Sequence, residues 1–144
     1  MHKFRLQQLK AYNNLVKKQI ECQKSGDYED AEYAYEQAIK ILPSALESYY
    51  QNACMLYEQK KYSECIEFID YDILQNEKID KLQTRMTDVY YLKADCLFQM
   101  KEYQEARETY ESSIEAALRS GILVSAILRT CSLEIFATLV LLGT

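Results

Sequence analysis

Side chains that commonly carry chemistry are few or widely spaced in this chain. Its five cysteines stand at long intervals and its single histidine is His2, so neither a Cys/His nucleophile nor a zinc site is predicted. Glu64 with Glu67, and Glu108 with Glu111, have the spacing of carboxylate pairs that acid–base catalysis could use. Pairs at this spacing are more typical of solvated helix faces. The sequence therefore predicts a protein that is not an enzyme, with no metal site and no cofactor.

The composition favours a helical domain. The chain has 144 residues, 49% of them hydrophobic, with three glycines and one proline. This is enough apolar material for one core, and too few turn residues for an all-β sandwich or barrel. The net charge of −5 excludes a general nucleic-acid footprint, although residues 1–20 carry five basic residues and no acid. We expect an all-α fold that binds no nucleic acid.

A short pattern occurs three times and reveals an internal repeat. Residues 26–31, 60–65 and 101–106 each contain a turn residue, a tyrosine two positions later and a small residue at the end. The first two copies are 34 residues apart and the last two are 41 apart. Apolar positions with a helical period lie before and after each copy, so every copy is predicted to join two helices.

The helices before the turns repeat as well. Tyr49-Tyr50-x2-Ala53-x2-Leu56 aligns with Tyr90-Tyr91-x2-Ala94-x2-Leu97. A helix–turn–helix unit with a period near 34, and with small residues where helices meet, resembles the tetratricopeptide repeat (TPR) over residues 12–116. The resemblance implies a right-handed superhelix of antiparallel helix hairpins that binds other proteins. The third unit also resembles, over residues 91–98, TPR subunits of the anaphase-promoting complex.

Three departures from the repeat lead to further expectations. Residues 3–24 are predicted to form one long first helix. The seven extra residues before the third unit correspond to about two helical turns, so Ile79–Met100 is predicted to be one lengthened helix. Gln19 stands at the small-residue position of the first unit. We expect a looser helix contact there, or a glutamine side chain that points away.

The TPR resemblance also implies a concave groove, lined by the first helix of each unit, as the functional site. Its candidate residues in this chain are Val16, Ile20, Tyr50, Gln51, Cys54, Tyr57, Tyr91, Leu92, Asp95 and Phe98. Their aromatic and aliphatic character predicts a peptide or helix segment of a partner protein, apolar or amphipathic, with basic flanks. We expect at least two of the four aromatic side chains to be exposed; the competing interpretation is that they only pack.

A second feature of the resemblance concerns chaperone-binding relatives, which grip an acidic tail with cations in this groove. The matching positions here are Val16, Ile20, Gln51, Asp88 and Leu92, and none of them carries a positive charge. The sequence therefore disfavours a co-chaperone of that type.

The C-terminal segment is strongly apolar and does not match a fourth repeat. We divide the chain into a repeat domain, residues 1–120, and a capping or interface helix, residues 121–144. Residues 122–142 could cap the last repeat, pair with a second copy in a homo-oligomer, or anchor the chain in a membrane. Arg129 and Glu134 fall within this stretch and argue against a membrane span.

These observations lead to one principal functional hypothesis and two alternatives. The principal hypothesis is a non-catalytic interaction module, a scaffold subunit of a larger assembly. The alternatives are a small chaperone similar to the TPR chaperones of type III secretion, and a tail-anchored membrane adaptor. The first residues have no apolar stretch of a signal peptide, and the cysteines do not suggest disulfides. A cytoplasmic or nuclear location is therefore expected.

Overall fold

The regular structure of the chain is helical. A computed structural model describes residues 2–121 and 137–143, and within these ranges it contains helices but no strand. The helices are α1 (His2–Ser25), α2 (Tyr28–Ile41), α3 (Glu47–Glu58), α4 (Tyr62–Phe68), the π-helical η1 (Ile69–Leu74), α5 (Met86–Gln99) and α6 (Tyr103–Ser120). Residues 137–142 are also helical. The all-α prediction is confirmed, as is the single long helix predicted over residues 3–24.

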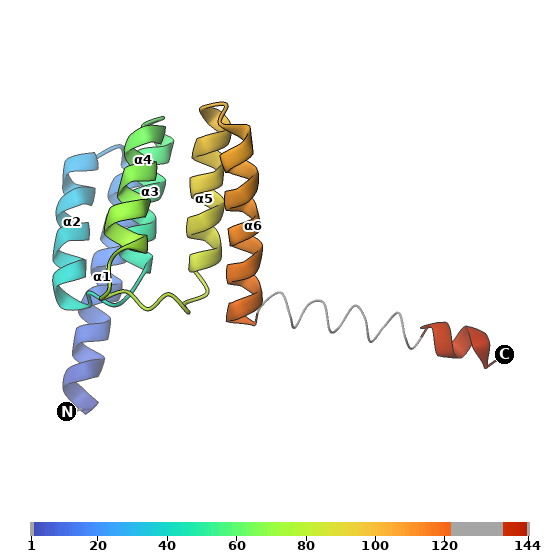
Figure 1. Cartoon of the computed structure of the whole chain (residues 1–144). Helices are drawn as coiled ribbons and strands as arrows, with labels where there is room; N and C mark the ends of the chain where they lie inside the picture. Colours follow the sequence, from blue (N-terminus) through green and yellow to red (C-terminus); the bar gives the residue numbers. More distant parts are fainter. Residues whose placement is uncertain (1, 122–136, 144) are drawn as a thin grey trace.

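The helices form three hairpins that stand side by side (Figure 1). Helix α1 pairs with α2, α3 with α4 and η1, and α5 with α6, while the first helices touch in the succession α1, α3, α5. Helix α2 also contacts α3, and α4 contacts α5. Each hairpin therefore covers the apolar face of its neighbour, as repeat architectures require. The right-handed sense of the superhelix stays a prediction.

The turns inside the hairpins repeat in backbone geometry. Gly26, Lys60 and Lys101, the first residues of the three short sequence patterns, have φ angles of 81°, 60° and 66°. In each turn the following residue donates a backbone hydrogen bond of 2.9–3.0 Å to a carbonyl five residues earlier. A left-handed residue with this bond is a common helix ending. The register of the sequence repeat is therefore also the register of the structure.

Small and apolar residues fill the contacts between the hairpins. The alanines of the repeat are buried, with Ala31, Ala53, Ala94 and Ala106 at most 2% exposed. Gln19, at the small-residue position of the first unit, is also fully buried. Its amide is hydrogen-bonded to Ser48, so the expectation of a looser contact or an outward side chain was wrong.

The seven-residue insertion does not lengthen a helix. Helix α5 begins at Met86, and the residues between η1 and α5 form an irregular segment, so the predicted helix over Ile79–Met100 was wrong. Ile79 is 4% exposed and belongs to the main core. The side chain of Gln83 accepts a hydrogen bond from the N–H of Leu46 and donates one to the carbonyl of Ser44. The insertion is therefore a loop that is hydrogen-bonded to the residues at the start of α3.

Candidate partner-binding groove

The predicted groove residues lie on the first helices of the three hairpins. Residues 16 and 20 belong to α1, residues 50, 51, 54 and 57 to α3, and residues 91, 92, 95 and 98 to α5. Residues 50, 54 and 57 are each 41 positions before residues 91, 95 and 98. Because α3 and α5 are in contact and share the repeat register, these side chains occupy equivalent positions on neighbouring helices.

The α5 portion presents two exposed aromatic rings. Tyr91 is 55% exposed and Phe98 is 52% exposed. Each ring makes an edge contact with a tyrosine of α6, at centroid distances of 5.4 Å to Tyr110 and 5.3 Å to Tyr103. Helix α6 therefore supports the two rings while about half of each remains open to solvent. Large, pre-positioned aromatic surfaces are typical of protein interfaces.

A carboxylate lies between these two rings in the sequence of α5. The hydroxyl of Tyr110 donates a hydrogen bond to Asp95. Burial, and then this carboxylate, raise the pKa of Tyr110. Burial and the Asp95 charge also raise the pKa of Tyr57 on α3. The negative charge of Asp95 thus acts on both sides of the α3–α5 contact.

The α3 portion is only partly open. Tyr50, Cys54 and Tyr57 are half-buried, and Tyr57 makes an edge contact of 5.4 Å with Tyr62 of α4. Burial raises the pKa of the Cys54 thiol to about 11. Since the thiolate is the nucleophilic form, Cys54 is a poor nucleophile near neutral pH. The chemistry of this part of the groove is packing and hydrogen bonding.

One cation of this region was missed by the sequence reasoning. Arg85 precedes α5; its Nε lies 2.7 Å from Glu47 Oε2 and its Nη1 lies 2.9 Å from Asp88 Oδ2. The guanidinium carbon is 4.7 Å from the ring centroid of Tyr50. The carboxylates hold the pKa of Arg85 above its usual range. Arg85 therefore offsets part of the negative charge of the two acids beside a hollow of about 490 Å³ that they line.

The spacing of the sequence contained a signal for this cluster. Glu47 and Asp88 are 41 residues apart, hence equivalent in the repeat, and Arg85 precedes Asp88 by three. A cation at i−3 on a helix reaches a carboxylate. The pairing of Arg85 with Glu47 could not be predicted from this spacing, because it depends on how the insertion loop packs against the start of α3.

Four of the predicted residues contribute less surface than expected. Val16 and Leu92 are 7% and 8% exposed, and Ile20 packs against the cluster that contains Val16. Gln51 already has partners within the chain. Its side-chain amide donates a hydrogen bond to Glu47, and its backbone carbonyl accepts one from the side chain of Gln23. The exposed aromatic surface therefore lies on α5, with its half-buried continuation on α3.

The described part of the chain offers no metal-binding cluster of three or more His, Cys, Asp or Glu. Its four cysteines are free thiols, and Cys131 lies outside the described residues. Within residues 2–121 and 137–143, no helix has both the length and the apolarity needed to cross a membrane.

Comparison with protein-family models relates the chain to a known family. Residues 24–113 match the family model described as anaphase-promoting complex, cyclosome, subunit 3. Searches of the curated proteins and of the solved structures found no match. The matched range begins near the end of α1 and extends into α6. It therefore includes the second helical hairpin, most of the third, and most of the groove residues.

Proposed function

Because the chain belongs to the anaphase-promoting complex, cyclosome, subunit 3 family, which is of the TPR type, we propose that it is a non-catalytic interaction subunit. In this proposal it holds an apolar or amphipathic segment of a partner protein against α3 and α5. The observation that carries the proposal is the pair of exposed rings, Tyr91 and Phe98, supported from behind by tyrosines of α6.

The chemistry of the groove narrows the class of partner. An apolar side chain of the partner would pack on Tyr91 and Phe98, and a lysine or arginine beside it would face Asp95. Glu47 and Asp88 share the single positive charge of Arg85, which weakens their attraction for a further cation. We therefore propose one basic group next to an apolar anchor.

The family also favours a place in a larger assembly, with the chain acting as a scaffold subunit. A multi-subunit complex of the kind that the family description names is our preferred context. The type III secretion-like chaperone and the tail-anchored adaptor stay as alternatives. A partner that is a secreted translocator would favour the first. Recovery of the chain in a membrane fraction would favour the second, whereas our proposal expects recovery with a cytoplasmic or nuclear complex.

We further propose that residues 1–120 act as the repeat domain and residues 121–144 as a capping or interface segment. Apolar residues on α6 support this division, since Ile114 is 53% exposed and Leu118 is 40% exposed. In the described part of the C-terminal segment, Leu141 and Leu142 are 75% and 79% exposed. Covering these surfaces within one chain, or between two copies, would remove apolar area from water.

Affinity capture with a matched pair of variants tests the groove. The first bait carries Tyr91→Ala and Phe98→Ala. The control bait carries Tyr33→Ala and Phe4→Ala, whose side chains are 60% and 62% exposed on α2 and α1. We expect partners captured by the wild-type chain to be lost with the first bait and kept with the control. Partners that survive on the Tyr91→Ala/Phe98→Ala bait would show that these rings only pack.

A further inference from the structure

A second surface lies between α2 and α4, the second helices of the first two hairpins. Two hollows of about 500 and 240 Å³ meet there and share the lining residues Glu32, Asn52, Leu56 and Glu64. We call this region the α2–α4 cleft. It is lined by side chains of α2, α3, α4 and η1, and none of its shared residues belongs to the candidate groove.

Asn52 marks the centre of this cleft. It lines both hollows although the residue is only 8% exposed. Its side-chain amide has no hydrogen-bond partner among residues 2–121 and 137–143. Among the described residues, the side-chain polar atom that is shielded from solvent without a partner is Thr87 Oγ1 and not an atom of Asn52. The Asn52 amide is therefore open to the two hollows and free to bind. An asparagine amide offers two donors and an acceptor, a set that matches the N–H and C=O of a peptide backbone.

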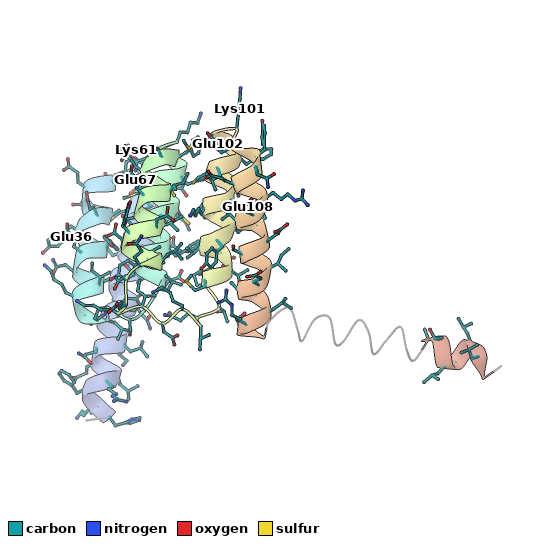
Figure 2. The ribbon with its side chains drawn as sticks, in the orientation of Figure 1. Glu36, Lys61, Glu67, Lys101, Glu102 and Glu108 are labelled. Carbon is teal, nitrogen blue, oxygen red and sulfur yellow. The ribbon has the colours of Figure 1, made fainter. Side chains whose placement is uncertain are left out.

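In the third repeat, the residue equivalent to Asn52 is a lysine that has a partner within the chain. Lys93 follows Asn52 by 41 residues, in the same register as Ala53 and Ala94. Lys93 Nζ lies 2.6 Å from Asp70 Oδ1. The contact between the second and third hairpins therefore contains an internal ion pair. The residue equivalent to Asp70, 34 positions earlier, is Glu36 on α2 (Figure 2). Between the first and second hairpins, Glu36 therefore stands where Asp70 stands, but Asn52 replaces the lysine.

The rim of the α2–α4 cleft is strongly acidic. It includes five carboxylates and one lysine, Lys61, which directly precedes α4; Figure 2 labels Lys61 and, on α4, Glu67. The carboxylates are Glu29, Glu32, Glu64, Glu67 and Asp72. None of them has a salt-bridge partner in the part of the chain that the structure describes. Besides burial, the charges of Asp72 and Glu32 raise the pKa of Tyr35, which lies in the same hollow.

The floor of the cleft is apolar. Leu56 lies beneath both hollows, and the rings of Tyr35 and Phe68 meet edge-on at 5.9 Å beside it. An anionic membrane or a nucleic acid would be repelled by the rim. The same described residues also lack a cluster that could hold a metal ion. A ligand must therefore bring apolar surface, backbone-like polar groups and distributed positive charge.

We propose that the α2–α4 cleft binds an extended segment of a partner protein in which lysine or arginine residues flank an apolar side chain. The Asn52 amide pairs with the backbone of that segment. The apolar side chain packs on Leu56, and the flanking cations face Glu32 and Glu64. This surface is additional to the groove of α3 and α5, so the chain has two docking sites on different sets of helices.

A defined peptide tests the proposal directly. The probe is the heptapeptide Lys-Ala-Lys-Phe-Lys-Ala-Lys, acetylated and amidated, added to the full chain labelled with nitrogen-15. We expect its binding to shift the side-chain amide resonance of Asn52 and the backbone resonances of residues 64–68. The peptide with glutamate in place of lysine has the wrong charge and should cause no shifts there.

The affinity of the peptide for cleft variants then shows which side chains contribute to binding. Asn52→Lys reproduces the arrangement of Lys93 and places a cation inside the cleft, so we expect it to weaken the peptide about tenfold or more. The double variant Glu32→Gln/Glu64→Gln changes only exposed side chains and should weaken binding severalfold even if Asn52→Lys impairs folding. Glu108→Gln, exposed on α6 (Figure 2), is the matched control and should bind like the wild-type chain.

The results that overturn the proposal are equally specific. Shifts at Tyr91 and Phe98 without shifts at Asn52 would place the basic peptide in the groove of α3 and α5 instead. The absence of binding, equal binding of the glutamate peptide, or unchanged affinity of both the Asn52→Lys and the double variant would each reject a docking role for the cleft.

Discussion

Gln19 and Ser48 exchange two hydrogen bonds at the contact between the first two hairpins. Gln19 Nε2 donates to the carbonyl oxygen of Ser48 at 3.0 Å, and Ser48 Oγ donates to Gln19 Oε1 at 2.8 Å. Both residues are fully buried. The N–H of Ser48, at the start of α3, donates to the hydroxyl of Tyr12 at 3.0 Å. A polar network therefore replaces the small-residue contact that the other repeats use.

Removing one member of this network should be costly. Ser48→Ala leaves Gln19 Oε1 buried without its donor, and we expect the free energy of unfolding to fall by about 1–3 kcal/mol. Urea unfolding followed by circular dichroism measures the change. Ser63→Ala, at an exposed position of α4, is the control and should stay within about 0.5 kcal/mol of the wild type. Equal midpoints for the two variants would contradict the role of the network.

Substitutions in the turns are expected to raise the free energy of unfolding. Lys60 and Lys101 adopt the left-handed conformation that Gly26 adopts in the first turn. This conformation costs a non-glycine residue about 1–2 kcal/mol. Glycine avoids that cost but loses about 0.5–1 kcal/mol more in conformational entropy on folding. We therefore expect Lys60→Gly and Lys101→Gly each to raise the free energy of unfolding by about 0.5–1 kcal/mol, measured in urea. A loss of stability in both would show that the lysine side chains have an unrecognised role.

The hairpins and their turns could be predicted because the repeat encodes them locally. The positions of Ala31, Ala53 and Ala94 follow from period and residue size alone. The resemblance of residues 91–98 to anaphase-promoting complex subunits also agrees with the family match. Exposed Tyr91 and Phe98 agree with the expectation that two of the four groove aromatics are accessible, whereas their binding role remains a proposal.

The errors came from interactions between residues far apart in the sequence. Ser48 is 29 positions from Gln19, and a periodic pattern does not say which polar group will meet another. The insertion was interpreted as helix because its length fits two turns. In the structure, Gln83 instead binds the start of α3 and Ile79 enters the core. These distant contacts hold the segment in a loop, and no local propensity reports them.

The small residues at the helix contacts predict a clear effect of added volume. Ala53 and Ala94 are both 0% exposed. Replacing either by leucine overpacks a filled contact, and we expect a loss of about 1–3 kcal/mol in the free energy of unfolding. Gln104→Leu adds a similar apolar side chain at an exposed position of α6 and should change little. Unchanged urea midpoints for both alanine variants would mean that the contacts can relax around the added atoms.

Deletion of residues 122–144 tests the proposed division of the chain. If this segment covers apolar surface, the truncated protein should aggregate or change its oligomeric state, because Ile114 and Leu118 on α6 would stay open to water. Light scattering gives the mass of both forms. A monodisperse truncated protein with the same oligomeric state and unchanged helicity would argue that the segment neither caps nor pairs.

Alkaline pH should destabilise the fold through its buried thiol and phenol groups. Burial raises the pKa of Cys54 from 9.0 to about 11 and raises the pKa values of Tyr35 and Tyr50 as well. Below about pH 9 both the folded and the unfolded chain keep the Cys54 proton. As the pH rises toward about 11, the unfolded chain releases that proton first, so unfolding becomes more favourable.

Urea midpoints measured from pH 8 to pH 11 report this effect. We expect a constant midpoint up to about pH 9 and a steady decrease above it. Cys54→Ala should reduce the decrease between pH 9 and 11 without removing it. The remaining decrease comes from the tyrosines and from Cys65, whose pKa is also raised by its interaction with Cys96 and by burial. A midpoint that stays level to pH 11 would show that water reaches these groups in the folded protein as freely as in the unfolded chain.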